Sequence, residues 1–223
     1  MNSGIHQRYK RSQVEQAIVA IDAGRGTAEA VLRANVKRLL DFDRNPEARI
    51  LDRASDNTAF FDGPSPGQGA EIAYRPYQAF ALLIGVRLLK SGMPQSRVVL
   101  FIRDTRVDLE SAFAHLASAD AAELYPSLSE EERSERIRDG DLVRGAANMM
   151  FLIVQAGAEP TGRPRPEHWG LEGGNVCNAE ALIERLVEFS KDGQAAIVLE
   201  LTNAVHQLMD TLPRTKVRKR GRQ

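Results

Sequence analysis

Cysteine is the scarcest of the chemically versatile residues in this sequence. Cys177 stands alone among 223 residues, so neither an internal disulfide nor a site built from several thiolates can form. The four histidines are scattered, and none has metal-ligand spacing to another histidine or to the cysteine. We therefore expect no metal and no cofactor.

Long apolar runs are missing as well. The longest, Ala79 to Val86, covers eight residues and stops at Arg87, whereas a membrane-spanning helix needs about 20. The first twenty residues include Arg8 and Lys10 and lack the apolar core of a secretory signal. We expect a cytoplasmic protein without a membrane partner.

Aromatic residues make up only 6% of the chain, although hydrophobic residues reach 43% and charged residues 27%. These values are those of an ordinary globular protein whose cores consist mainly of Leu, Val, Ile and Ala. The length allows one large domain or two small ones.

The net charge is zero, but the charges are unevenly distributed. Residues 1 to 117 hold 16 basic and 13 acidic side chains, residues 118 to 213 hold 8 and 17, and the last ten residues hold six basic ones and no acid. The acidic middle argues against nucleic acid running along that region. The basic tail, 214–223, is predicted to be disordered, and serves as a non-specific DNA handle, a solubility tail or a partner-binding segment.

Helical spacing of apolar residues dominates the first half of the chain. It predicts helices from Ser12 to Gly24, from Thr27 to about Arg44, from Pro76 to Gly92 and from Pro94 onward. A turn-rich loop, Gly63–Gly69, and a short strand, Ala70–Tyr74, would close a hairpin or wing. Phe60 and Phe61 would anchor this connection to the core. We therefore predict a winged helix-turn-helix domain over residues 1–120.

The helix that starts at Pro94 carries an apolar stripe. Its members are Val98, Ile102, Leu109, Phe113 and Leu116. Such a stripe either pairs two copies of the chain or packs on the protein's own core, and both interpretations stay open.

The second half of the chain starts with a polar connection that ends in a charged helix. Ser129 to Glu132 has the pattern of a capping box, from which the helix runs to Arg138. The order strand, helix, strand, helix follows, over Met149–Val154, Ala179–Phe189, Ala195–Leu201 and Asn203–Leu212. We predict a small acidic α/β domain over 121–213, for effector binding or oligomerisation. The predicted fold class is mainly α, with the winged helix-turn-helix domain first.

Basic and amide side chains gather where a winged helix would meet DNA. The predicted DNA-binding residues are Arg33, Asn35, Lys37, Arg38, Arg44, Gln68, Arg75, Ser96 and Arg97. Those on the polar side of the second helix would enter the major groove, where Asn35 offers a bidentate edge to adenine. Gln68 and Arg75 on the wing would meet phosphate or the minor groove. Ser96 and Arg97, at a helix start, would hold phosphate through backbone amides.

Two segments carry a resemblance to MerR-type regulators. Asn35 to Arg44 resembles the recognition helix of that family, with equivalent chemical roles at Val36, Lys37, Leu39, Phe42, Asp43 and Arg44. Tyr74 to Val99 resembles the next two helices of the family, including the turn at Gly92. The resemblance covers roughly residues 9 to 117 and implies a regulator under effector control. The single cysteine argues against thiolate metal sensing.

We therefore predict a transcriptional regulator that binds double-stranded DNA sequence-specifically as a homodimer and responds to a small-molecule or protein effector. The chain is not predicted to be an enzyme, and Cys177 is interpreted as a buried structural residue. Two alternatives stay open. One is a winged helix adaptor or structural protein that binds another protein, and the other is a small enzyme centred on Cys177 or His206 in the C-terminal half.

Overall fold

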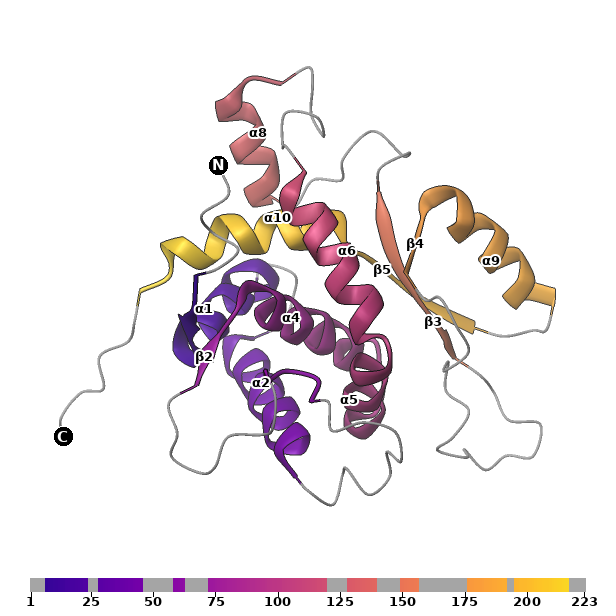
Figure 1. Ribbon diagram of the computed structural model, residues 1–223, viewed down its shortest axis with the longest axis horizontal. Coiled ribbons are helices and arrows are strands. Elements are labelled where there is room, and N and C mark those ends of the chain that lie inside the picture. The colour runs from indigo at the N-terminus through magenta and orange to yellow at the C-terminus, as the bar shows by residue number, and fades with distance from the viewer. Residues whose placement is uncertain are drawn as a thin grey trace.

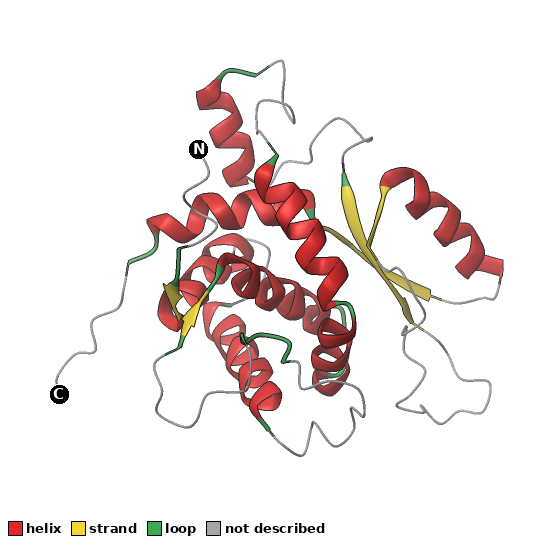
Figure 2. Cartoon of the chain, in the orientation of Figure 1, coloured by secondary structure: helices red, strands yellow, loops and turns green. Residues whose placement is uncertain are grey.

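The computed structural model describes residues 7–23, 28–45, 58–62, 72–119, 128–139, 149–156, 176–191 and 195–216. Helices form the bulk of the molecule, and a small sheet with one further helix lies at one side (Figures 1 and 2). The prediction of a mainly helical chain with a small sheet is confirmed.

The first two helices, α1 (Arg11–Asp22) and α2 (Glu29–Arg44), are amphipathic and pack against each other. The apolar residues at helical spacing in α1 are buried, none more than 8% exposed: Val14, Ala17, Ile18 and Ile21. In α2 the buried arc passes through Leu32, Val36 and Leu39, which follow helical spacing. Val31, which lies outside this arc, is 49% exposed.

Helix α4 (Pro76–Lys90) is buried on almost every side, which explains its near-continuous apolar sequence. Pro76 occupies the first turn of this helix, as predicted. Gly92 lies in the turn after the helix, and its φ of 94° is the left-handed conformation that favours glycine. Gly85 allows close packing, since a Cβ there would lie 3.0 Å from Leu39 Cδ1. No helix in the described part of the chain is long and apolar enough to span a membrane.

The continuous helix expected after Pro94 is instead two helices, α5 (Gln95–Asp104) and α6 (Arg106–Ser118). The break is at Thr105, whose backbone leaves the helical region at φ −89° and ψ 7°. Its hydroxyl and its backbone N–H both donate to the Phe101 carbonyl, at 2.7 and 3.0 Å.

The apolar stripe on these two helices packs on the protein's own core. All five of its members, Val98, Ile102, Leu109, Phe113 and Leu116, are at most 3% exposed. They belong to one buried cluster with α1, α2 and α4. This stripe is therefore not a surface for pairing two copies of the chain.

A two-stranded antiparallel sheet joins the start of the described chain to the segment before α4. Strand β1 (Tyr9–Lys10) pairs with β2 (Ala73–Tyr74), with Tyr9 opposite Tyr74. The predicted strand before Pro76 is present, but its observed partner precedes α1 and is not the neighbouring strand of a hairpin. The winged form of this domain is therefore not confirmed, and the loop Gly63–Gly69 lies outside the described residues.

The sheet at the side of the molecule has three strands in the order β4-β3-β5, and both pairs are antiparallel. The elements are β3 (Met150–Ala156), β4 (Val176–Asn178), α9 (Ala179–Lys191) and β5 (Ala195–Glu200). Leu152 and Val154 face the helical core, and α9 covers the other face (Figure 1). The sequence predicted β3, α9 and β5, and did not predict the short strand β4.

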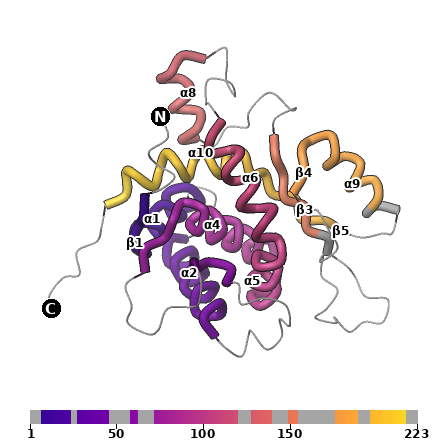
Figure 3. The backbone as a smooth tube through the Cα atoms, in the orientation of Figure 1, coloured from indigo at the N-terminus to yellow at the C-terminus, as the bar shows by residue number. Residues whose placement is uncertain are grey.

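Helix α10 (Thr202–Thr211) packs against α1, α4 and α6, and the 3-10 turn η4 (Leu212–Arg214) follows it. Val205 and Leu208 are fully buried in the cluster that also holds the apolar residues of α1. The units predicted over 1–120 and 121–213 therefore share one core. Gln13 Nε2 donates to the Thr215 carbonyl at 3.1 Å, so the two ends of the described chain meet beside α1 (Figure 3).

Candidate nucleic-acid interface

The face of α2 that points away from the core carries two exposed basic side chains. Lys37 and Arg38 lie on this face together with Val31, Ala34 and Asp41, all exposed. Consecutive residues of a helix are 100° apart, which places these five positions in one arc opposite the buried one. Lys37 and Arg38 are therefore accessible to a large ligand, as an exposed recognition helix requires.

The first turn of α5 adjoins this face. Gln95 Nε2 donates a hydrogen bond of 2.7 Å to the Arg38 carbonyl, and α2 and α5 pack side by side (Figure 1). Ser96 and Arg97, which follow Gln95, are half-buried. Pro94 at the N-cap makes no side-chain hydrogen bond to the first turn of α5. The structure thus brings four predicted residues, Lys37, Arg38, Ser96 and Arg97, to neighbouring elements.

Arg33 and Arg44, two further predicted residues on α2, are engaged in contacts within the protein. Arg33 pairs with Glu29 at 2.7 Å and with Glu15 of α1 at 3.5 Å. The guanidinium of Arg44 lies over the Phe61 ring, 5.2 Å from its centroid. These two arginines hold α2 to its neighbours and are less accessible than Lys37 and Arg38.

Arg75 and Asn35, two of the three remaining predicted residues, have different surroundings. Arg75 is exposed and pairs with Asp62, and this hydrogen bond raises the pKa of Arg75. Asn35 is half-buried on α2, and Gln68 lies outside the described residues. The structure therefore does not group Arg75 with the exposed face of α2.

A buried ion pair that the sequence analysis missed holds α2 in place. Asp43 and Arg103 are both completely buried, and Arg103 Nη2 donates to Asp43 Oδ1 at 2.8 Å. The signal for this pair is in the spacing, because Asp43 stands four residues after Leu39 and Arg103 four after Val99. Charged residues in register with an apolar stripe lie on the buried face of a helix, and there they need partners.

Cys177 is buried and His206 is half-buried. Cys177 on β4 is 8% exposed, and burial raises the pKa of its thiol, whereas a reactive cysteine needs a lowered one. Burial lowers the pKa of His206 on α10 to about 4. The buried state of Cys177 agrees with its interpretation as a structural residue.

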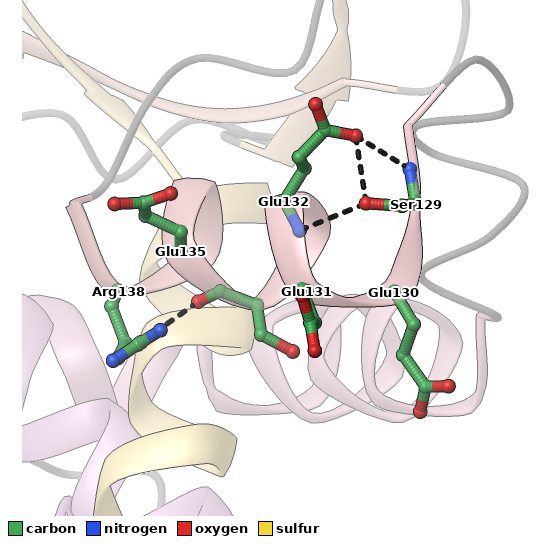
Figure 4. Close-up of a pocket in the computed structure, with 7 residues that line it drawn as sticks. Ser129, Glu130, Glu131, Glu132, Glu135 and Arg138 are labelled. Atoms are coloured by element: carbon green, nitrogen blue, oxygen red, sulfur yellow. Dashed lines mark hydrogen bonds between the residues drawn. The ribbon is translucent and has the colours of Figure 1, made fainter.

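The acidic helix α8 (Glu130–Asp139) borders a hollow of about 880 Å³ (Figure 4). The predicted capping box is confirmed, since Ser129 N and Oγ donate to Glu132 Oε2 at 2.9 and 2.7 Å. These bonds lower the pKa of Glu132. Glu130, Glu131 and Glu135 also line this hollow, together with Arg138.

Within the described part of the chain, no group of three or more His, Cys, Asp or Glu side chains is arranged to hold a metal ion. No protein-family model, curated protein or solved structure matches this chain. The similarity to MerR-type regulators therefore depends on the residues of the sequence alone.

Proposed function

We propose that this protein binds duplex DNA through the exposed face of α2 and the first turn of α5, and acts in the cytoplasm as a transcriptional regulator. The observation that carries the proposal is the hydrogen bond from Gln95 Nε2 to the Arg38 carbonyl, which joins the two elements into one surface. Exposed basic side chains neutralise DNA phosphates, and the first turn of a helix offers backbone N–H groups to the same phosphates.

The rigidity of α2 supports this proposal. Its C-terminal turn is held by the Asp43–Arg103 ion pair, and Asp43 also accepts the backbone N–H groups of Ala59 and Phe60 at 3.0 and 2.9 Å. A helix fixed on its buried side presents its outer side chains in a constant geometry, which favours recognition of a regular groove.

The contacts within the protein narrow the set of proposed DNA contacts. Arg33, Arg44 and Arg75 are engaged with other residues of the chain. The phosphate contacts are therefore assigned to Lys37 and Arg38 and to the first turn of α5. Asn35, beside them on α2, is the residue proposed to read a base.

The test is DNA binding by the double variant Lys37→Ala/Arg38→Ala, measured by fluorescence anisotropy on labelled genomic fragments at low and moderate salt. The matched control is Arg133→Ala/Arg136→Ala, which removes two positive charges from α8. We expect weaker binding only for the α2 variant. The plot of log affinity against log salt should become shallower for this variant. The magnitude of its negative slope should decrease by about 1.8, since each lost phosphate contact removes about 0.9.

Equal affinity and slope in wild type and the α2 variant would overturn the assignment. Absence of binding by the wild type at either salt would favour the adaptor alternative instead. The proposal includes a homodimer on paired half-sites, and a symmetric motif in genome-wide immunoprecipitation with sequencing would support it.

A further inference from the structure

A second hollow, of about 410 Å³, lies where the ends of α1 and α4 meet β5 and α10. Its charged lining residues are Asp22 of α1, Arg87 and Lys90 of α4, and Glu200 of β5. Helix α10 packs against both α1 and α4 (Figure 1), and all three helices contribute side chains to the main core of the protein. None of these residues is among the predicted DNA-binding residues.

Asp22 is 1% exposed, and its two carboxylate oxygens have different surroundings. Arg87 donates to Oδ1 from Nε at 3.3 Å and from Nη2 at 3.0 Å. Oδ2 lies 3.5 Å from Lys90 Nζ and accepts no hydrogen bond from any residue that the structure describes. A buried oxygen without a donor is costly in free energy, so a ligand that brings a donor is favoured here.

Gln207 of α10 contributes a second acceptor to the same hollow. Its side chain is 3% exposed, and its Nε2 donates to the Arg138 carbonyl at 3.1 Å. Its Oε1 is buried and has no hydrogen-bond partner in the described chain. Gln207 Oε1 therefore has no hydrogen-bond donor within the described chain, and Asp22 Oδ2 has only the Lys90 ammonium, at 3.5 Å.

The charged lining residues comprise two bases and two acids, so their formal charges cancel. Burial raises the pKa of Glu200, whose carboxylate accepts the backbone N–H of Asn203 at 2.9 Å. A ligand with a net charge would place a charge without an opposite partner in this partly enclosed hollow. A ligand that carries one charge of each sign would match the lining.

We propose that this hollow binds a small zwitterion, an α-amino acid. The ammonium group of the ligand donates to Asp22 Oδ2 and Gln207 Oε1, and its carboxylate faces the Lys90 ammonium. Its side chain lies against the apolar lining residues Leu199 and Ala204. This proposal does not depend on DNA binding, because it concerns other residues and is tested without DNA.

The first experiment is isothermal titration calorimetry of the full chain with each of the standard amino acids at millimolar concentration. The best binder is then compared with its N-acetyl derivative, which has no ammonium, and its amide, which has no carboxylate. We expect saturable binding of the free amino acid. Each derivative should bind roughly tenfold more weakly or worse, since each lacks a hydrogen-bonded charge.

Two variants assign the binding to this hollow. Gln207→Leu and Lys90→Gln should each weaken binding of the free amino acid roughly tenfold or more. Lys90→Gln should also bind the amino acid and its amide equally, because the charge that distinguishes them is gone. Arg136→Gln, on the exposed side of α8, should bind like the wild type. Thermal melting of each variant checks that the fold is kept.

Three results would overturn the proposal. They are absence of binding by every amino acid, equal affinity for the amino acid and both derivatives, and unchanged binding in folded Gln207→Leu and Lys90→Gln proteins. DNA binding measured separately keeps a failure here distinct from a failure of the proposed function.

Discussion

Arg103 Nη2 lies 2.8 Å from Asp43 Oδ1, and both side chains are completely inaccessible to solvent. The same carboxylate accepts the backbone N–H groups of Ala59 and Phe60. One buried anion thus connects α2, α5 and the segment 58–62. A buried charge that is both paired and hydrogen-bonded is tolerated, whereas the same charge without its partner is strongly destabilising.

Replacement of Arg103 by methionine should lower the free energy of unfolding by about 3–5 kcal/mol, because the Asp43 carboxylate would be left buried without a cation. Urea denaturation measures this change. The control is Arg33→Met, whose pairs with Glu29 and Glu15 are only partly buried and should cost at most about 1 kcal/mol. Equal losses in the two variants would show that the buried pair has no special importance for stability.

Local sequence patterns were enough to predict most helices of this chain. The spacing of Val14, Ala17, Ile18 and Ile21 identified α1, and all four are buried. Phe60 and Phe61 are core anchors as expected, at 0% and 1% exposure. The capping box at Ser129 is formed. These features depend on residues a few positions apart, which is the range that periodicity and capping rules describe.

The features that the sequence did not predict depend on residues far apart or on a single residue. The pairing of Tyr9 with Tyr74 joins segments on either side of two helices. The break at Thr105 is a change of backbone conformation at one residue, where the hydroxyl bonds the Phe101 carbonyl. Of the candidate interface, the exposure of Lys37 and Arg38 was predictable from the helical arc. The hollow around Asp22 was not, because four elements form it.

Neutralisation of Asp41 tests whether the exposed face of α2 meets phosphate. Asp41 lies on this face with Lys37 and Arg38, so its carboxylate would repel a bound duplex. Asp41→Asn should strengthen DNA binding by about 1 kcal/mol, roughly fivefold, at low salt, and less at high salt. Anisotropy titrations measure this gain. Asp108→Asn, on α6, is the control and should not change the affinity. Weaker binding by Asp41→Asn would contradict the proposed orientation.

His206 should make the protein less stable in mild acid. Burial lowers its pKa in the folded state to about 4, from an ordinary value of 6.5. Between these two values the unfolded chain binds more protons than the folded one, so stability decreases as the pH falls from 6.5 toward 4. The His206 contribution should amount to about 2 kcal/mol between pH 7 and pH 5.

The measurement is urea denaturation at both pH values for wild type and His206→Gln. The variant cannot gain this proton, so its stability should depend less steeply on pH. The difference between the two proteins cancels the contributions of other titrating groups, Glu200 and Asp210 included. Parallel pH profiles would show that His206 is not held in its neutral form.

The placement of α10 against α1 has a consequence for synthesis of the protein in the cell. The bond between Gln13 and Thr215 joins positions 202 residues apart. The ribosome releases α1 long before it releases the helix that covers it. Contacts of such large separation form slowly, and apolar surfaces exposed in the meantime promote aggregation. We therefore expect the yield of native protein in translation to increase with the supply of chaperones that bind nascent chains.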